Sequence, residues 1–338
     1  MSSAPMSLRQ ETIATISRRR FVTALGALSL TGGLSACSGA DPKQMAVAAH
    51  VWVGYEPMFL AQREGWLDSQ QVRLIETAAA PESMQALAEG RVQAAALTLD
   101  ETFKAREAGQ KLSVVLVFNM SAGADMLVTR APLKSLAELR GKRLAYEQSS
   151  VGELLLSEIL QKAGLPVSDV TLVPLSVDRH VEGWKQQSFD AVITYEPVAT
   201  ELLNLGANRL FDTRQLPDTV VDVLAVRSDA LETHGTALRH LIAAHFKALD
   251  HLTRNPQDAA YRMAAHLKVP AGQVLPAFKG LVLPDALSNA RLLAGAQPTL
   301  VQTAGKLSGV MFRSGLLQRH DSLSGLINAD YLPAESPR

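Results

Sequence analysis

Residues 45–67, MAVAAHVWVGYEPMFLAQREGWL, form one strand–loop–helix unit that sets the pattern of the chain. The run 45–53 is apolar and rich in residues that favour strands, and 54–57 (GYEP) turns the chain. Segment 58–64 then has the spacing of a helix, which Gly65 ends. We therefore expect a strand, a turn and a helix in this order.

The same order of strand and helix continues after this unit. The sequence predicts strands over 72–76, 92–97 and 112–118 and helices over 81–89 and 100–108. The runs 92–97 and 112–118 are continuously apolar, as expected for strands of a sheet that is covered on both faces. Strands that alternate with helices at this spacing favour an α/β domain with a mostly parallel sheet.

The pattern then restarts and builds a second unit. We predict strands over 125–129, 143–146, 170–174 and 191–194, helices over 135–139, 151–163, 178–186 and 197–205, a further strand over 220–226, and helices over 229–254, 256–267, 271–279 and 286–315. Two α/β units of about a hundred residues each, followed by a return strand, predict two lobes with a cleft between them. The crossings near 120–128 and 220–227 would form a hinge that closes around a ligand.

Four segments carry a resemblance to a known family. Residues 52–61 (WVGYEPMFLA), followed by 65–67 (GWL), resemble the opening of ABC-type solute-binding proteins of the nitrate, sulfonate and taurine group. Segments 86–95 (ALAEGRVQAA), 135–144 (SLAELRGKRL) and 189–197 (FDAVITYEP) are similar to later family segments, in the same order. The resemblance implies the type II periplasmic-binding fold, with a discontinuous lobe I and an inserted lobe II.

The resemblance and the pattern together predict the domain boundaries. We expect lobe I over 46–124 and 222–333, lobe II over 125–221, and a tail over 334–338. The resemblance implies a monomeric solute receptor that passes its ligand to an ABC permease and ATPase. Because such domains also serve as sensors, a receptor for a membrane signalling protein is an alternative. A pyrimidine-related enzyme of the same fold is another.

The N-terminal segment has the pattern of an export signal. Residues 17–21 (SRRRF) precede a short apolar run over 21–30, and 34–37 (LSAC) closes it. The paired arginines resemble a twin-arginine signal, and the last four residues resemble a lipoprotein lipobox. We expect a signal peptide over 1–36, lipidation of Cys37, a tether over 37–45 and a periplasmic, membrane-anchored protein. An ordinary cleaved signal that happens to contain a cysteine is the alternative.

Composition excludes several classes of function. The chain has 33 basic and 33 acidic side chains, and residues 1–36 hold four of the basic and one of the acidic ones, so the remainder carries a net charge of −3. No basic face for nucleic acid is indicated. One cysteine permits neither an internal disulfide nor a cysteine-rich metal site. The sequence has no Gly-x-Ser-x-Gly, Walker or His-Glu-x-x-His motif, so we expect no catalytic residue, metal or cofactor.

Ligands of such folds bind where strands end and helices begin, and the loops at these places supply the candidate residues. The candidates are Trp52, Gly54, Tyr55, Glu56, Asp100, Ser121, Gly123, Glu147, Ser149, Ser150, Asp178, Tyr195, Glu196 and Asp222. Aromatic rings offer a flat wall. Asp100 and Ser149 could instead serve as helix N-caps, and the helix start at 149–152 could hold an anion through its free amides.

The sign of the charge points to the chemistry of the ligand. Six of these candidates are acids, whereas only Arg179 and Lys185 are basic near the same loops. Acids beside aromatic rings favour an ammonium, amidine or aminopyrimidine-like ligand, by ion pairing and cation–π contact. The sequence therefore predicts a small, nitrogen-containing organic solute rather than nitrate or a sulfonate.

Overall fold

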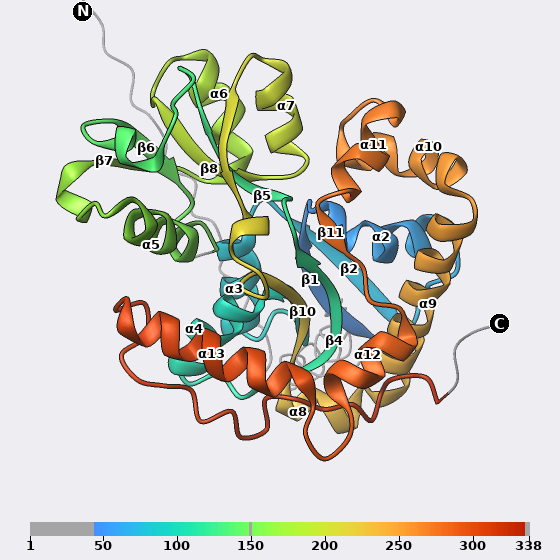
Figure 1. Cartoon of the computed structure of the whole chain (residues 1–338). Coiled ribbons are helices and arrows are strands. Elements are labelled where there is room, and N and C mark those ends of the chain that lie inside the picture. The colour runs from blue at the N-terminus through green and yellow to red at the C-terminus, as the bar shows by residue number, and fades with distance from the viewer. Residues whose placement is uncertain (1–43, 149–150, 335–338) are drawn as a thin grey trace, which may run out of the picture. The chain divides into compact units, whose positions relative to one another are not determined.

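The computed structural model describes residues 44–148 and 151–334, which belong to one compact unit (Figure 1). The expected signal peptide, Cys37, Ser149, Ser150 and nearly all of the expected tether and tail lie outside the described residues. In the described part of the chain, no helix has both the length and the apolar character needed to cross a membrane.

Lobe I is built on a mixed sheet of six strands. These are β1 (Met45–His50), β2 (Val72–Thr77), β3 (Ala94–Thr98), β4 (Leu112–Ser121), β10 (Val221–Arg227) and β11 (Leu281–Val282), in the order β11-β4-β10-β3-β1-β2. β1 pairs in parallel with β2 and β3, whereas β10 pairs antiparallel with both β3 and β4. The return strand β10 thus lies inside the sheet, and lobe I is assembled from two separate stretches of chain.

Helices cover both faces of this sheet. They are α2 (Glu56–Arg63), α3 (Ala80–Ala88), α4 (Leu99–Glu107), α8 (Ser228–Thr233), α9 (Gly235–Arg254), α10 (Pro256–Leu267), α11 (Ala271–Phe278), α12 (Ala286–Leu293) and α13 (Thr299–Arg313). Figure 1 shows α2, α9 and α10 on one side of the sheet and α4, α12 and α13 on the other.

Two of the long helices that the sequence predicts are in fact interrupted. The predicted helix over 229–254 is divided at His234, which has non-helical dihedral angles. The predicted helix over 286–315 is divided between α12 and α13. There Gly295 has a φ of +92°, a conformation that glycine tolerates best, and Pro298 precedes the first residue of α13.

Lobe II is built on a five-stranded sheet. Its strands are β5 (Asp125–Thr129), β6 (Arg143–Tyr146), β7 (Thr171–Pro174), β8 (Ala191–Tyr195) and β9 (Asn208–Asp212), in the order β7-β6-β8-β5-β9. The sequence analysis missed β9, an edge strand whose residues range from exposed to buried and which has no continuous apolar run. Residues 136–139, expected as a helix, form a 3₁₀ turn.

The two faces of the second sheet pack against different helices. The helices of this lobe are α5 (Val151–Ala163), α6 (His180–Lys185) and α7 (Val198–Asn204). Leu127 and Ile193 share a buried cluster with Ile159 of α5. Val128 and Val192, their neighbours along the strands, share another with Trp184 of α6. Because neighbouring strand residues point to opposite faces, α5 covers one face of the sheet and α6 covers the other.

Two connections join the lobes, and they are hydrogen bonded to each other. Residues 122–124 lead from β4 to β5, and 213–220 lead from β9 back to β10. The hydroxyl Oγ1 of Thr213 accepts a hydrogen bond from the backbone N–H of Gly123 at 2.8 Å and lies 2.7 Å from Oγ of Ser121. Gly123 has a φ of +121°, which favours glycine. Ser121 and Gly123 therefore tie the two crossings together.

Candidate functional site

A small cavity lies between the two lobes, at the ends of strands from both sheets. Its lining residues are His50, Trp52, Thr98, Glu101, Asp125, Val151, Tyr195, Val220 and Asp222. The space, which we call the inner cavity, has a volume of about 10 Å³. This is roughly the space that one water molecule needs.

The carboxylate of Asp222 in this cavity is held on both of its oxygens. The hydroxyl of Tyr55 donates a hydrogen bond of 2.5 Å to Oδ1. The amide of Asn119, in the orientation that satisfies its neighbours, donates to Oδ2 at 2.8 Å and accepts from Nε1 of Trp52 at 3.2 Å. These contacts fix the position of the carboxylate before any ligand arrives.

Gly54 makes room for this network. A Cβ atom at this position would lie 1.9 Å from the nearer terminal atom of the Asn119 amide and 2.5 Å from Nε1 of Trp52. Only glycine lets the backbone approach so closely. Gly54, a candidate ligand residue in the sequence, therefore supports the site through packing and is not among the residues that line the cavity.

Two buried titratable side chains in the inner cavity have unused hydrogen-bonding capacity. Within the described part of the chain, no hydrogen bond reaches Oδ2 of Asp125 or Nδ1 of His50. These residues are only 2% and 6% exposed. Buried polar atoms without a partner are costly and rare in folded proteins. Their presence in one cavity between the lobes makes this cavity a candidate binding site.

Burial shifts the titration of these groups. It raises the pKa of Asp125 from 3.8 to about 7, although a hydrogen bond with Ser121 acts in the opposite direction. Burial also raises the pKa of Asp222 well above its usual value, against the effect of the Tyr55 hydrogen bond. It lowers the pKa of His50 from 6.5 to about 4, so this imidazole is neutral at pH 7. Near neutral pH, ionisation of Asp125 can therefore make the cavity negative, whereas His50 adds no positive charge.

Tyr195 and Trp52 provide an aromatic wall. Their rings meet edge to face with centroids 5.4 Å apart, and the ring of Tyr195 lies 5.9 Å from the ring of His50. The hydroxyl of Tyr195 donates to Oε2 of Glu147 at 3.5 Å, and Oε1 of Glu147 accepts from the backbone N–H of Val177 at 3.2 Å. Glu147 thus holds the hydroxyl of Tyr195 and does not itself line the inner cavity.

Three acids from the candidate set lie outside the lining of the inner cavity. Glu56 is fully buried and contacts Arg63 and Nδ1 of His266, the latter at 2.5 Å. Glu196 accepts a hydrogen bond of 3.0 Å from the backbone N–H of Thr200 in the first turn of α7. Asp100 is fully buried in the first turn of α4 and does not line the inner cavity. Of the candidate set, Trp52, Tyr195 and Asp222 line this cavity.

The cavity contains residues that the sequence analysis did not select. They are His50, Thr98, Glu101, Asp125, Val151 and Val220. Glu101 has a detectable signal, since Thr98 and Glu101 have the spacing of a capping box; Oε2 of Glu101 accepts from the backbone N–H of Thr98 at 2.8 Å. His50 has no such signal in the sequence. Every residue of β1 is buried, so an alternation of polar and apolar residues cannot show which face of the strand is functional.

A second, larger space adjoins the cleft, and we call it the outer chamber. It has a volume of about 430 Å³ and is lined by Val51, Glu76, Thr77, Ala78, Val177, Asp178, Val181, Tyr195, Pro197, Val198, Glu201, Leu267, Lys268 and Val269. Asp178, a candidate from the sequence, lies here and contacts Ser176. Tyr195 lines both spaces.

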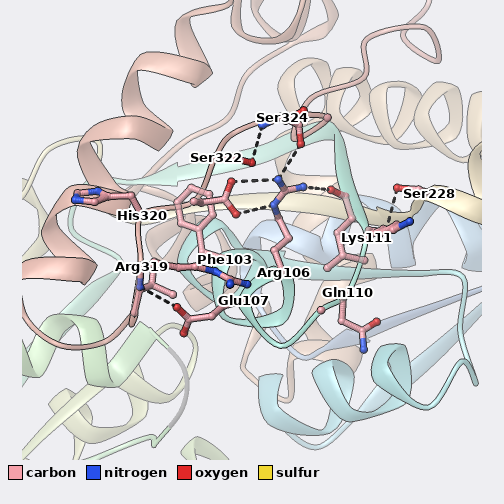
Figure 2. Close-up of a pocket in the computed structure, with 15 residues that line it drawn as sticks. Phe103, Arg106, Glu107, Gln110, Lys111, Ser228, Arg319, His320, Ser322 and Ser324 are labelled. Atoms are coloured by element: carbon pink, nitrogen blue, oxygen red, sulfur yellow. Dashed lines mark hydrogen bonds and ion pairs between the residues drawn. The ribbon is translucent and has the colours of Figure 1, made fainter.

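A third hollow of about 500 Å³ lies near the other end of α4 (Figure 2). Its basic residues include Arg106, Lys111 and Arg319. Arg106 is occupied by Asp321, with bonds of 2.8 and 3.1 Å, and by the carbonyl of Leu112 at 2.7 Å. Because this hollow lies away from the strand ends that form the cleft, we do not place the solute site there.

Comparisons with known proteins agree with the fold. The model of the family described as NMT1/THI5 like matches residues 52–259. A curated binding protein from Brucella abortus is 26% identical over 163 residues, which are 46% of this chain and 50% of the relative. The match thus spans half the length of that relative. A protein provisionally named as aliphatic sulfonates-binding, from Escherichia coli K12, is 26% identical over 249 residues, 70% of this chain and 77% of the relative.

Solved structures share the fold at low sequence identity. The alkanesulfonate-binding protein SsuA from Xanthomonas axonopodis pv. citri, solved with bound MOPS, superposes with a TM-score of 0.71 at 19% identity. The match covers 84% of this chain and 98% of that one. The desulfurization enzyme DSZB superposes with a TM-score of 0.61 at 17% identity, over 86% of this chain and 98% of that one. The fold therefore occurs in both binding proteins and an enzyme.

Proposed function

Because the chain belongs to the NMT1/THI5-like family, we propose that it is the solute-binding protein of an ABC importer and that its solute is a small, nitrogen-containing cation. The similarity to sulfonate-binding proteins supports the binding role. The cavity between the lobes supports it too, since this is the place where ligands bind in such folds.

The observation that carries the proposal is the charge of the inner cavity. Glu101, Asp125 and Asp222 line it, and its described lining includes neither an arginine nor a lysine. The raised pKa values of Asp125 and Asp222 indicate that the cavity disfavours negative charge that no cation offsets, and a sulfonate would find no arginine or lysine in the described lining. An organic cation would instead pair with a carboxylate and lie against the rings of Trp52 and Tyr195, a contact worth about 0.5–2 kcal/mol.

Binding without turnover is part of the proposal. The curated relatives from Brucella abortus and Escherichia coli are named as binding proteins, which supports a binding role. When the ligand brings the lobes into contact, the closed protein would present a surface to the permease. The ligand favours the closed state over the open state only by the difference between its affinities for the two states. We further propose that the protein acts on the periplasmic side of a membrane, where acylated Cys37 would hold it.

A thermal-shift screen of the purified protein tests the proposal. The panel contains amines, amidines, aminopyrimidines, taurine, alkanesulfonates and nitrate at equal concentrations. A ligand present at 100 times its Kd stabilises the folded state by about 2.7 kcal/mol. We expect a rise in melting temperature with a nitrogenous cation, lost in Asp125→Asn and kept in the control Asp250→Asn, which changes an exposed acid of α9. Saturable binding of a sulfonate or nitrate, with no response to any cation, would contradict it.

A further inference from the structure

The outer chamber is mainly apolar and large enough for part of an organic ligand. Eight aliphatic or proline side chains line it: Val51, Ala78, Val177, Val181, Pro197, Val198, Leu267 and Val269. Its volume of about 430 Å³ falls in the range of roughly 300–1,000 Å³ that is usual for small-molecule sites. The described residues come from both lobes, so a ligand in this chamber would contact both.

The outer chamber and the inner cavity are neighbours. The side chain of Tyr195 lines both. Consecutive residues of the chain also line different spaces: His50 and Trp52 line the inner cavity, and Val51 between them lines the outer chamber. A molecule that extends past the ring of Tyr195 would therefore occupy both spaces.

The two spaces differ in what they can accept. The inner cavity, at about 10 Å³, suits a group of the size of one water molecule. An –NH₃⁺ group has this size, whereas a guanidinium or a pyrimidine ring does not. Its three N–H donors match acceptors in the cavity, among which Oδ2 of Asp125 has no hydrogen bond from the described residues.

Charge at the outer chamber restricts the rest of the ligand. Glu76, Asp178 and Glu201 line this space together with a single cation, Lys268. Glu76 lies 3.2 Å from Nε2 of His266, and Glu201 lies 3.9 Å from Nζ of Lys185. An anionic tail would meet this excess of carboxylates, so an uncharged apolar substituent fits best.

We infer that the ligand is an amphipathic primary amine, whose ammonium group occupies the inner cavity beside Asp125 and Asp222 and whose apolar substituent fills the outer chamber. The inference rests on the proposed function and names the class of solute within it. In this arrangement the ring of Tyr195 lies beside the bond that joins the ammonium group to the apolar substituent, and it sets the orientation of the ligand.

Calorimetric titration with ethylamine, butylamine and hexylamine tests the inference. Burial of one methylene is worth about 0.8 kcal/mol, or roughly a fourfold gain in affinity. We expect affinity to rise three- to fourfold per added methylene, with one amine bound per protein. Equal affinity along the series would overturn the inference.

A variant that fills part of the outer chamber provides a second test of the inference. Ala78 is exposed at the chamber wall, and its backbone N–H bonds Glu82 at 2.7 Å, a contact that a side-chain change leaves in place. In Ala78→Phe we expect the ratio of hexylamine to ethylamine affinity to fall towards one. The control Ala131→Phe changes an exposed alanine of lobe II outside the chamber, and the ratio should stay as in the parent protein.

The outcomes separate the inference from the proposed function. If an amidine or aminopyrimidine binds and the amines do not, the function stands and the amphipathic amine is excluded. If Ala78→Phe and Ala131→Phe alter the affinity ratio alike, the outer chamber does not hold the substituent. If no nitrogenous cation binds, the proposed function falls and the inference falls with it.

Discussion

Tyr55 and Asp222 are 167 positions apart in the sequence and are joined by a hydrogen bond of 2.5 Å. Tyr55 belongs to the first strand–loop–helix unit, and Asp222 belongs to the return strand β10. Asn119 holds the other carboxylate oxygen at 2.8 Å. The bond therefore links the two chain segments of lobe I at the inner cavity and fixes an acid that lines it.

Removal of the Tyr55 hydroxyl tests this link. In Tyr55→Phe the aromatic contact with Phe118, at a centroid distance of 5.1 Å, remains possible, while the buried Asp222 loses one donor. A buried group left without its partner costs about 1–3 kcal/mol. We expect urea unfolding to show a loss of this size. The control Tyr261→Phe changes a side chain that is 77% exposed and should have little effect; equal losses in both variants would contradict the account.

Gly54 offers a test of packing behind the site. A Cβ atom there would overlap the side-chain amide of Asn119, so Gly54→Ala must displace the amide that holds Asp222. We expect a destabilisation of about 1–3 kcal/mol, typical of overpacking. Gly272→Ala is the matched control, because its Cβ would meet no atom within 4 Å. If urea unfolding gives the two variants the same stability, Gly54 has no special role.

The raised pKa of Asp125 predicts a pH-dependent stability. Its carboxyl has a pKa of about 7 in the folded chain and an ordinary value of 3.8, so the folded state binds the proton more tightly. Stability from this group is therefore present at low pH and is lost as pH rises from about 4 to 7. Asp125→Asn removes the effect. We expect the variant to exceed the parent in free energy of unfolding at pH 8, by up to about 4 kcal/mol, and to approach it at pH 4.

Parallel stability curves for the parent and Asp125→Asn between pH 4 and 8 would contradict the assignment. The control Asp250→Asn changes an exposed acid that pairs with Arg254 at 2.8 Å. The difference in free energy of unfolding between Asp250→Asn and the parent protein should not grow with pH over the same range.

An ion pair between α4 and α5 joins the lobes. Nζ of Lys104 lies 2.5 Å from Oε2 of Glu153, and the two side chains are 15% and 27% exposed. Such pairs at partly open sites contribute about 0.2–1 kcal/mol. We expect Glu153→Gln to weaken ligand affinity by up to about fivefold, because the state with the lobes in contact becomes less favourable. Calorimetry with the tightest-binding member of the panel measures this, and unchanged affinity would exclude a role for the pair.

Much of the fold was predictable because its signals are local. The bounds of β5, β6, α5 and α10 agree with the sequence prediction, since each has an apolar pattern and a clear stop. β9 was missed because it lies at a sheet edge and its burial follows neither an alternating nor a continuous pattern. The antiparallel direction of β10 depends on the path of the chain through lobe II, which no local pattern reports.

The site was harder to predict than the fold. Asp100 and Glu196 do not line the inner cavity, whereas their neighbours Glu101, which was not among the candidates, and Tyr195, which was, do line it. In each case the neighbouring residue faces the cavity, because one step along a helix or strand end changes the direction of the side chain. The described lining of the cavity holds three acids and no arginine or lysine, and of these acids Asp222 alone was among the candidates from the sequence.

The position of a bound cation tests the central claim most directly. A crystal structure of the protein with hexylamine, or with the best nitrogenous ligand from the thermal-shift screen, would provide it. The account predicts the ligand nitrogen within hydrogen-bonding distance of the Asp125 carboxylate, between the two lobes. An anion in that cavity, or the cation bound instead in the hollow near Arg106, would contradict it.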